Sequence, residues 1–325
     1  MNINDKIYGT VEVSEPVLLE ILNGPSLERL KDIDQFGYFT PYAQERHFSR
    51  FEHSVGVFLL LQKYGASLEE QVAGLIHDVS HSAFSHCVDY VLAASRAEKQ
   101  EHQDSIFDTF VRRSELPAIL EKRGFETGNV LDDSRHPLKE TQLPDLCADR
   151  IDYTLRDICL SGEREIALSF LDKLSAENGR WIFMDYTSAR EFAERYAYLN
   201  KTYWAGVTTA AMFYTVGEYL KHALSKAYIL ENDLYTTDTH VLAKIAKHHS
   251  YDTELMLLYD KMNNRIPFKN DPTNYDAIVK CKSRAINPLC RYEKSIKRVS
   301  EVDPAWLDVI ERESKPKVFY LKFER

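Results

Sequence analysis

The spacing of apolar residues along the chain predicts a mostly helical protein. Leu75, Ile76 and Val79 recur at the 3.6-residue period of a helix. Ser67 and Glu70 precede them with the spacing of an N-terminal capping box, so we expect a helix from Ser67 to Val79. The same periodicity predicts further helices at residues 16–23, 27–33, 51–61, 84–94, 106–111, 115–125, 145–161, 168–174, 188–230, 239–249 and 253–262.

Three short segments favour β-structure instead. Residues 7–13 alternate in polarity, residues 181–184 follow an Asn-Gly pair, and residues 318–321 are strand-like. We therefore expect a mostly α fold with small β elements near both termini and around residues 181–184. Neither repeats nor a low-complexity linker divide the chain. The main domain is expected to cover residues 1–250, with residues 251–325 packed on it as a helical and strand appendage of one compact unit.

Composition limits the class of protein. The 325 residues are 44% hydrophobic and 28% charged, which suits a soluble globular chain with a sizeable core. No apolar run approaches the roughly 18 residues of a membrane span, and the N-terminus lacks the residue order of a signal peptide. Five cysteines without a C-x-x-C pair indicate reduced thiols, so we expect a cytoplasmic protein. The net charge of -9 argues against broad nucleic-acid binding, although a pocket for a phosphorylated substrate can still be locally positive.

Histidines gather at the end of the helix predicted from Ser67 to Val79. His77, Asp78, His81 and His86 lie within ten residues of one another. Burying a His-Asp pair among apolar residues is costly unless something compensates for its polarity. A metal ion is the simplest candidate, because neutral imidazoles and carboxylates are common metal ligands.

Two further residues extend this cluster to a predicted metal site. His53 stands near the start of the preceding predicted helix, and Asp149 stands in a carboxylate-rich stretch of a later one. With His77 and Asp78 they suit one divalent ion that keeps positions for water and substrate. Mn²⁺, Fe²⁺, Zn²⁺, Ni²⁺ and Mg²⁺ all remain open. A lone buried histidine is usually a core residue with satisfied hydrogen bonds, but four ligand-type residues at matched helix positions favour a metal.

Other polar residues nearby are candidates for proton transfer. His81 would face the same way as His77 if the helix continued through it. A histidine held by an aspartate can act as a general acid toward a leaving oxygen. We therefore expect His86 to be catalytic, with Asp89 and His102 as helpers. Packing in a turn is the alternative role for the first two, and His102 stands in a charged stretch where an exposed histidine is ordinary.

The predicted ligands follow the H…HD…D pattern of the HD-domain phosphohydrolases, which this sequence resembles. Residues 50–57, 77–86 and 149–157 are also similar to the deoxynucleoside triphosphate triphosphohydrolase branch of that superfamily. The resemblance implies an HD-domain helical bundle with one divalent metal. It implies hydrolysis of a (deoxy)nucleoside triphosphate at the α-phosphorus, which gives the nucleoside and triphosphate, and it is compatible with a homo-oligomer.

The resemblance also implies substrate contacts. Leu199 and Asn200 depart from the Gln-His pair of the family, and residues 251–325 show no match. Instead of contacting a substrate, Arg150, Arg156 and Arg190 could form surface ion pairs, and Tyr153 and Tyr198 could pack in the core. Phosphate contacts fall on Arg50, His81, Arg150 and Arg190, and sugar or base contacts fall on Gln35, Tyr153, Asp157 and Tyr198.

Two rival functions remain from the sequence. A nucleoside monophosphatase or a phosphodiesterase could use the same metal site. A nucleotide-binding protein that has lost turnover is the alternative outside enzymology, although all predicted ligands are present.

Overall fold

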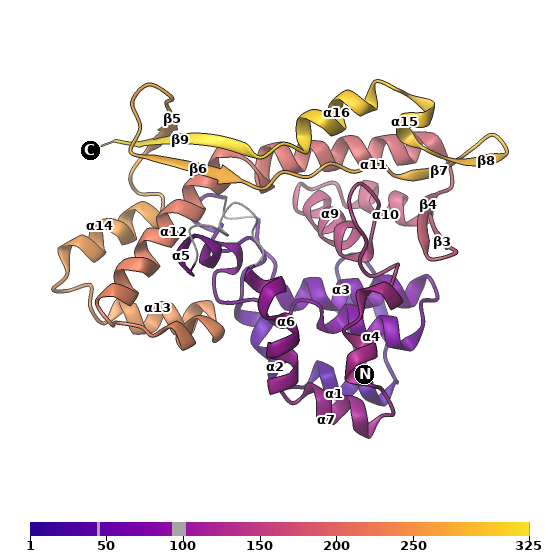
Figure 1. Ribbon diagram of the computed structural model, residues 1–325, viewed down its shortest axis with the longest axis horizontal. Coiled ribbons are helices and arrows are strands. Elements are labelled where there is room, and N and C mark those ends of the chain that lie inside the picture. The colour runs from indigo at the N-terminus through magenta and orange to yellow at the C-terminus, as the bar shows by residue number, and fades with distance from the viewer. Residues whose placement is uncertain (44–45, 93–101, 325) are drawn as a thin grey trace.

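Three helices form the centre of the molecule (Figure 1). The structure, a computed structural model, describes residues 1–43, 46–92 and 102–324. The central helices are α3 (Arg50–Lys63), α4 (Leu68–Ile76) and α9 (Ala148–Leu160), and α3 packs against both of the others. A capping box formed by Ser49 and Glu52 satisfies free amides at the start of α3. The centre is thus the helical bundle that the sequence predicts.

Helix α4 begins where predicted and ends earlier. The Ser67 side chain accepts a hydrogen bond from Glu70 N at 3.2 Å, as expected of an N-cap. The helix ends at Ile76 rather than at Val79. The chain then continues in turns whose hydrogen bonds join residues three positions apart, such as Val79 N to the Ile76 carbonyl. These turns carry the histidine-rich stretch out of the helix and toward α3 and α9.

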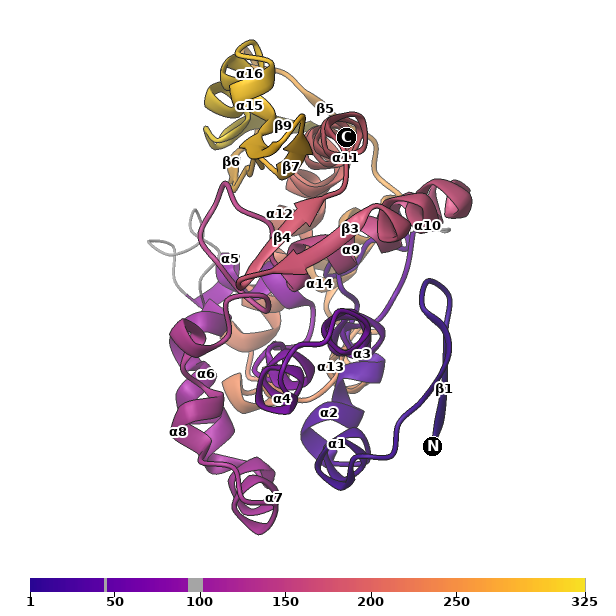
Figure 2. The same ribbon diagram turned by 90° about the vertical axis from the view of Figure 1, so that its right-hand side faces the viewer.

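The N-terminal residues form a hairpin that contacts α9 (Figure 2). Of the strand predicted at residues 7–13, residues 9–12 form β2, which pairs with the earlier strand β1, and Ile7 lies in the turn between the two. Ile7 is buried, which explains the apolar pattern at a turn position. The elements of this region are β1 (Asn2–Asp5), β2 (Gly9–Glu12), α1 (Pro16–Leu22), α2 (Pro25–Glu28) and the 3-10 helix η1 (Arg29–Asp32).

Short helices connect α4 to α9. The helix predicted at residues 84–94 corresponds to η2 and α5, and its last two residues lie outside the described part of the chain. The elements are η2 (Ser85–Val88), α5 (Asp89–Leu92), α6 (His102–Arg113), α7 (Leu116–Lys122), α8 (Thr127–Val130) and η3 (Asp133–Arg135).

The helical pattern at residues 188–230 forms two long helices, α11 (Tyr186–Leu199) and α12 (Val207–Ser225), joined by the π-helical turn η4 (Asn200–Trp204). Such turns are rare and often occur at functional sites.

No helix in the described residues is long and apolar enough to cross a membrane. The remaining elements are α10 (Arg164–Asp172), β3 (Leu174–Glu177), β4 (Arg180–Phe183), η5 (Glu231–Tyr235), α13 (Asp238–Ala246) and α14 (Thr253–Met262).

The C-terminal part contains more β-structure than the sequence predicts, so the fold is mostly α and not all α. It lies along α11 and α12 across the top of Figure 1. β7 pairs in parallel with β4 in a sheet of order β3-β4-β7-β8, and a second sheet has the order β5-β9-β6. Most of these strands are too short to show a clear alternation in sequence. The elements are β5 (Phe268–Asn270), β6 (Ala277–Cys281), β7 (Leu289–Tyr292), β8 (Ser295–Arg298), α15 (Val299–Val302), α16 (Trp306–Glu313) and β9 (Lys317–Phe323).

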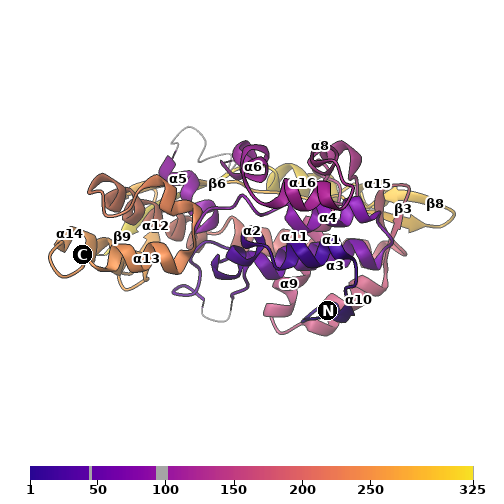
Figure 3. The same cartoon turned by 90° about the horizontal axis from the view of Figure 1, so that it is seen from below.

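Three clusters of buried apolar side chains surround the candidate site. One joins α3, α9 and α11, a second surrounds α12, and a third joins α3 and α4 with α1. Helices α1, α3 and α4 lie together at the middle of the view in Figure 3. Val57 belongs to the first cluster and Phe58 to the third, so α3 is packed on two sides. This packing makes α3 a rigid support for functional side chains.

Candidate metal centre and substrate cavity

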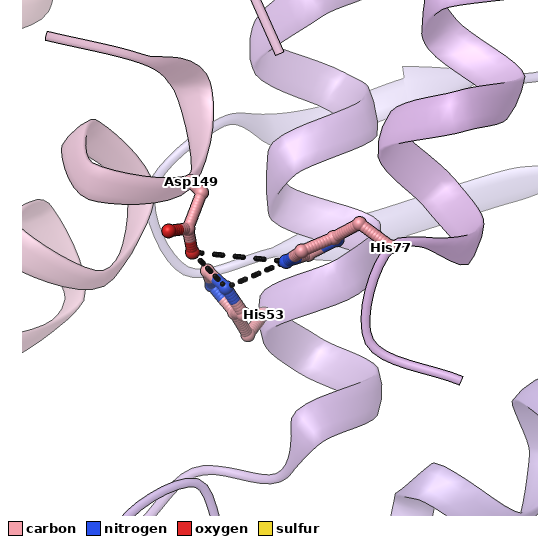
Figure 4. Close-up of side chains that lie close together, drawn as sticks. All are labelled: His53, His77 and Asp149. Atoms are coloured by element: carbon pink, nitrogen blue, oxygen red, sulfur yellow. Dashed lines mark hydrogen bonds and ion pairs between the residues drawn. The ribbon is translucent and has the colours of Figure 1, made fainter. Parts of the chain in front are cut away.

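Three side chains from three helical elements converge on one point (Figure 4). His53 lies in α3, His77 directly follows α4, and Asp149 lies in the first turn of α9. His53 Nε2 lies 3.2 Å from His77 Nε2 and 2.9 Å from Asp149 Oδ1. His77 Nε2 lies 3.7 Å from the same oxygen. Two imidazole nitrogens and one carboxylate oxygen thus form a group that could hold a metal ion.

The hydrogen bonds of the two histidines leave both Nε2 atoms as candidate ligands. His77 Nδ1 lies 2.8 Å from the Gly74 carbonyl oxygen, and His53 Nδ1 lies 2.8 Å from Asp152 Oδ2. A carbonyl and a carboxylate accept hydrogen bonds, so each Nδ1 carries a proton. The Nε2 lone pairs of two neutral rings would then face each other at 3.2 Å and repel unless a cation lay between them. The donor set therefore fits a divalent ion.

The electrostatics of this point also favour positive charge. Burial alone would lower the pKa of His53, but its hydrogen bonds to Asp149 and Asp152 outweigh burial and raise the pKa to about 9. Burial acts to raise the pKa of Asp149, yet the hydrogen bonds with His53 and His77 bring that pKa well below its usual value. A proton or a metal ion is therefore stabilised between these groups.

Asp78, the fourth predicted ligand, lies beside this group and is shared with an arginine. Its Oδ1 lies 3.5 Å from His77 Nε2, and its Oδ2 accepts a hydrogen bond from Arg50 Nη1 at 2.8 Å. Burial acts against the charged form of Asp78, but the Arg50 guanidinium and the nearby histidines hold its pKa well below the usual value. Asp78 therefore keeps a negative charge near the candidate ligand atoms, in an orientation fixed by Arg50.

A buried network behind His53 fixes the orientation of this ring. Asp152 accepts hydrogen bonds at 2.8 Å from His53 Nδ1, from Arg156 Nε and from the Tyr8 hydroxyl. Arg156 also pairs with Asp5 at 2.8 Å, so the N-terminal hairpin is tied to the network behind His53. A carboxylate that holds a metal-ligating histidine from behind typically changes metal affinity by about 10- to 100-fold.

Gly56 leaves the space that this network needs. A Cβ atom at Gly56 would lie 2.0 Å from Arg156 Nη2 and 2.1 Å from Asp152 Oδ1.

The role of Asp152 was not predicted from the sequence. The available signal was its spacing of three residues from Asp149, which places both carboxylates on one face of α9.

The candidate metal centre borders a cavity of about 420 Å³. This volume lies within the usual range for small-molecule sites. Many of the residues predicted from the sequence line it together. They are Gln35, Arg50, His77, Asp78, His81, His86, Asp149, Arg150, Tyr153 and Asp157.

His81 and His86 lie side by side at the cavity, with ring centroids 5.2 Å apart. His81 follows the end of α4, so the prediction that a continuing helix aligns it with His77 is wrong, and the turn brings it to the cavity instead. Burial, followed by the Arg50 charge, lowers the pKa of His81 to about 3. His86 Nδ1 pairs with Asp89 Oδ2 at 3.1 Å, which leaves its Nε2 for a ligand. His81 can therefore hydrogen-bond to an anion without adding charge.

Other polar groups of the cavity lining differ in how many hydrogen bonds they already make. Gln35 Oε1 is buried and has no hydrogen-bond partner within the described residues, so a ligand could use it. Asp157 accepts hydrogen bonds from Arg46 Nη1 at 2.7 Å and from Trp204 Nε1 at 2.6 Å. Burial nevertheless raises the pKa of Asp157 to about 6. Tyr153 packs edge-on against Trp204, with ring centroids 4.9 Å apart.

Five of the predicted site residues do not line this cavity. His53 and Asp89 are buried behind lining residues, with His53 against His77 and Asp149 and with Asp89 paired with His86.

The other three predicted residues lie elsewhere. His102 Nε2 lies 3.0 Å from the Tyr235 hydroxyl, and the backbone amide of His102 donates a hydrogen bond to Asp89 Oδ1. Arg190 pairs with Asp303 at 3.1 Å and lies away from the metal centre. Tyr198 is 59% exposed. None of these three side chains is among the residues that line the cavity, so their predicted catalytic and substrate-binding roles stay predictions.

Other residues reach the cavity without any recognisable signal in the sequence. Tyr203 and Trp204 come from η4, and Lys282 and Arg284 come from the segment between β6 and β7. All four depend on tertiary packing, which the local pattern of the chain does not encode.

A second group near Asp149 is less suited to a metal ion. Glu140, Cys147 and Asp149 offer ligand atoms within 4.8 Å of one another. Arg150 Nη1 lies 3.0 Å from Cys147 Sγ, and Arg150 Nη2 lies 3.0 Å from Glu140 Oε1. Burial also raises the pKa of the Cys147 thiol well above its usual value. A guanidinium therefore already supplies the positive charge at this point, and the thiol stays protonated.

Comparison with known proteins matches this geometry. The HD domain family matches residues 50–157. The uncharacterized protein YdhJ of Bacillus subtilis is 38% identical over 292 residues, which cover 89% of this chain and 88% of that protein. The metal-dependent phosphohydrolase cns2 of Cordyceps militaris is 33% identical over 223 residues, which cover 66% of this chain and 64% of that protein.

Two further similarities are more limited. The deoxynucleoside triphosphate triphosphohydrolase SAMHD1 of Danio rerio is 32% identical over 142 residues, which cover 37% of this chain and 22% of that protein. A phosphohydrolase structure from Bacteroides thetaiotaomicron superposes with a TM-score of 0.70 over 100% of both chains at 19% identity, which shows a shared fold. Together with the converging ligands and the similarity over most of the Bacillus subtilis protein, the match at residues 50–157 shows that the chain belongs to the HD-domain family of metal-dependent phosphohydrolases.

Proposed function

We propose that the protein hydrolyses (deoxy)nucleoside triphosphates to the nucleoside and triphosphate, with one divalent ion held by His53, His77, Asp78 and Asp149. The proposal is carried by the position of the His53, His77 and Asp149 group beside a cavity lined with aromatic and cationic side chains. When bound, a divalent ion supplies Lewis-acid polarisation of a phosphoryl oxygen and lowers the pKa of a coordinated water. Mn²⁺ is the first ion to test.

The histidines beside the metal centre are proposed to act on the reacting phosphate. His86, held by Asp89, would protonate the leaving oxygen through its free Nε2. His81, whose Nε2 lies 3.4 Å from Asp78 Oδ1 and whose pKa burial lowers to about 3, would contact a phosphate oxygen without adding charge. Arg50 would act mainly by holding Asp78, because their ion pair neutralises both charges.

Three lining residues, Gln35, Tyr153 and Asp157, are proposed to hold the nucleoside. Tyr153 and Asp157 would contact sugar hydroxyls, and Gln35 would use its unpartnered oxygen for the sugar. Aromatic rings offer stacking surfaces for a base. The aromatic residues of the lining are Phe36, Tyr153, Tyr203, Trp204 and Phe213.

One observation favours a second candidate, a nucleoside monophosphatase or phosphodiesterase on the same site. Arg190 does not reach the cavity, and Arg150 is paired with Glu140 at 3.0 Å. Two expected phosphate contacts are therefore missing or already neutralised, which would suit a substrate with fewer phosphates. A protein that binds nucleotides without turnover remains the third alternative.

Product analysis distinguishes these functions. The purified protein, loaded with Mn²⁺, is incubated with nucleoside mono-, di- and triphosphates in ¹⁸O-labelled water. We expect free nucleoside and labelled inorganic triphosphate from the triphosphates. Orthophosphate released from the triphosphates would reject attack at the α-phosphorus, and orthophosphate released from the monophosphates alone would support the monophosphatase. Absence of any product from nucleotides and from simple phosphodiesters, in a metal-loaded protein, would contradict a hydrolase.

A further inference from the structure

Two of the cations that line the cavity are already used to hold the protein together. Arg50 donates through Nη1 to Asp78 at 2.8 Å, through Nε to Ser85 Oγ at 3.0 Å and through Nη2 to the Gln35 carbonyl at 2.9 Å. Arg150 donates through Nη1 to the Thr141 carbonyl at 2.7 Å, and its Nη2 is paired with Glu140. A polyphosphate that enters the cavity would therefore need positive charge from elsewhere.

Arg284 differs from both. Its side chain lines the cavity, is half-buried, and makes no hydrogen bond or ion pair within residues 1–43, 46–92 and 102–324. The charge of Arg284 acts to lower the pKa of Tyr153 and of Tyr196, although burial raises both. Arg284 and Tyr153 both belong to the cavity wall. Lys282, two residues earlier, lines the same cavity.

The segment that carries Arg284 is fixed through its backbone. Asn200 is fully buried at the start of the π-helical turn η4. Its Oδ1 accepts a hydrogen bond from Arg284 N at 3.1 Å, and its Nδ2 donates one to Ser283 Oγ at 2.8 Å. The same turn carries Tyr203 to the cavity. Asn200 thus sets the position of Arg284 and leaves the guanidinium unengaged.

We propose that Arg284, positioned by Asn200, binds the phosphates beyond the one that is attacked and so selects polyphosphorylated substrates. A guanidinium is planar and pairs with two phosphate oxygens at once, which a lysine does not reproduce. Lys282 adds charge on the same side. This inference rests on the proposed function only in the identity of the substrate. The C-terminal part of the chain thereby completes a site whose chemistry lies in the HD domain.

The test measures binding of inorganic triphosphate, so it does not depend on turnover. Isothermal titration is carried out on the Mn²⁺-loaded protein, the R284Q variant and the R284K variant. We expect R284Q to bind inorganic triphosphate about 10- to 100-fold more weakly, as for loss of a charged hydrogen-bonding pair, and R284K to fall between. Orthophosphate binding and Mn²⁺ content should stay unchanged in both. R180Q is the matched control, because Arg180 is exposed on β4, and it should behave as wild type.

Equal affinity of wild type and R284Q for inorganic triphosphate, or no binding by wild type, would overturn the inference. An equal loss of affinity for orthophosphate and triphosphate would also overturn it, because the effect would then lie at the metal. If R284Q weakens triphosphate binding while wild type hydrolyses no nucleotide, the inference stands and the proposed reaction fails.

The positioning role of Asn200 has a separate readout. N200A should weaken triphosphate binding in the wild-type background and add little in the R284Q background, because both changes remove the same contact. Additive effects of the two substitutions on affinity would show that Asn200 acts independently of Arg284 and would contradict the positioning role. N200D keeps the acceptor for Arg284 N and should restore part of the affinity.

Discussion

The HD-domain helices and the C-terminal part of the chain meet at one cavity, but they hold their side chains differently. In residues 50–157 the candidate ligands stand on or beside helices, and hydrogen bonds fix them from behind, as Asp152 does for His53. In residues 251–325, Arg284 stands on a segment between two strands, and Asn200 fixes its backbone rather than its side chain. On the function proposed above, the first region would provide the reactive centre, and the second would adjust which substrates that centre accepts.

The largest effect is expected from H77A. Loss of one of the converging nitrogens should remove the bound metal and reduce kcat/KM by at least about 10³-fold, because a metal contributes several kcal/mol to transition-state stabilisation. Metal content by mass spectrometry and steady-state kinetics measure both. H240A is the matched control, since His240 is exposed on α13. An H77A protein with full metal content would contradict the assignment, whereas R284Q should keep its metal.

A smaller effect is expected from D152N. The amide cannot replace both oxygens that hold His53, Arg156 and Tyr8. Metal affinity should fall by about 10- to 100-fold, as measured by competition with a chelator. D172N, which changes an exposed aspartate at the end of α10, should leave affinity unchanged. Wild-type affinity in D152N would mean that α3 alone orients His53.

G56A tests whether the space behind His53 is required. The added methyl group would meet the Arg156 guanidinium at 2.0 Å, so the network must shift. We expect a loss of about 1–3 kcal/mol in the free energy of unfolding, as for other overpacked cores, together with weaker metal binding. G128A is the control, because a Cβ at Gly128 meets nothing within 4 Å. Equal stability of G56A and G128A by denaturant titration would show that the network repacks freely.

The smallest effect on activity is expected at Asp238, which joins the two loops that carry Gln35 and His86. It accepts backbone hydrogen bonds from Asp34 N at 2.9 Å and from Phe84 N at 2.7 Å, yet burial raises its pKa to about 8. The folded protein thus keeps this proton to a higher pH than the unfolded chain, whose aspartates titrate near pH 4. Its contribution to stability is present below about pH 4 and is lost as the pH rises toward 8.

D238N cannot titrate, so its stability should depend less on pH than that of wild type. The difference in slope across pH 4–8 should be at most about 1.4 kcal/mol per pH unit. Denaturant titrations at several pH values measure it, with D172N as the control for an exposed carboxylate. Parallel curves for D238N and wild type would show that Asp238 is ionised in the folded protein.

Much of the helical fold can be predicted from the sequence, because periodicity and capping residues are local. The cap at Ser67 is one such signal, and the predicted helix at residues 145–161 corresponds to α9. The end of α4 could not be predicted, because the turn that follows is held by an ion pair between Asp78 and Arg50, two residues far apart in the sequence. The C-terminal strands are short and depend on partners far along the chain, such as the pairing of β7 with β4.

The candidate site shows the same division. His53, His77 and Asp149 carry residue types and spacings typical of metal ligands, so the sequence predicts them and the structure brings them together. Arg190 has the expected residue type but not the expected position. Arg284 lines the cavity although no sequence motif marks it. Its role depends on how Asn200 in η4 holds a segment 84 residues further along the chain.

Anomalous diffraction from crystals soaked with Mn²⁺ tests the central claim most directly. The account predicts one strong peak within coordination distance of His53 Nε2, His77 Nε2 and Asp149 Oδ1, facing the cavity, and no such peak in H77A crystals. A peak at the Glu140 and Cys147 group instead, or no peak at a saturating Mn²⁺ concentration, would contradict the account.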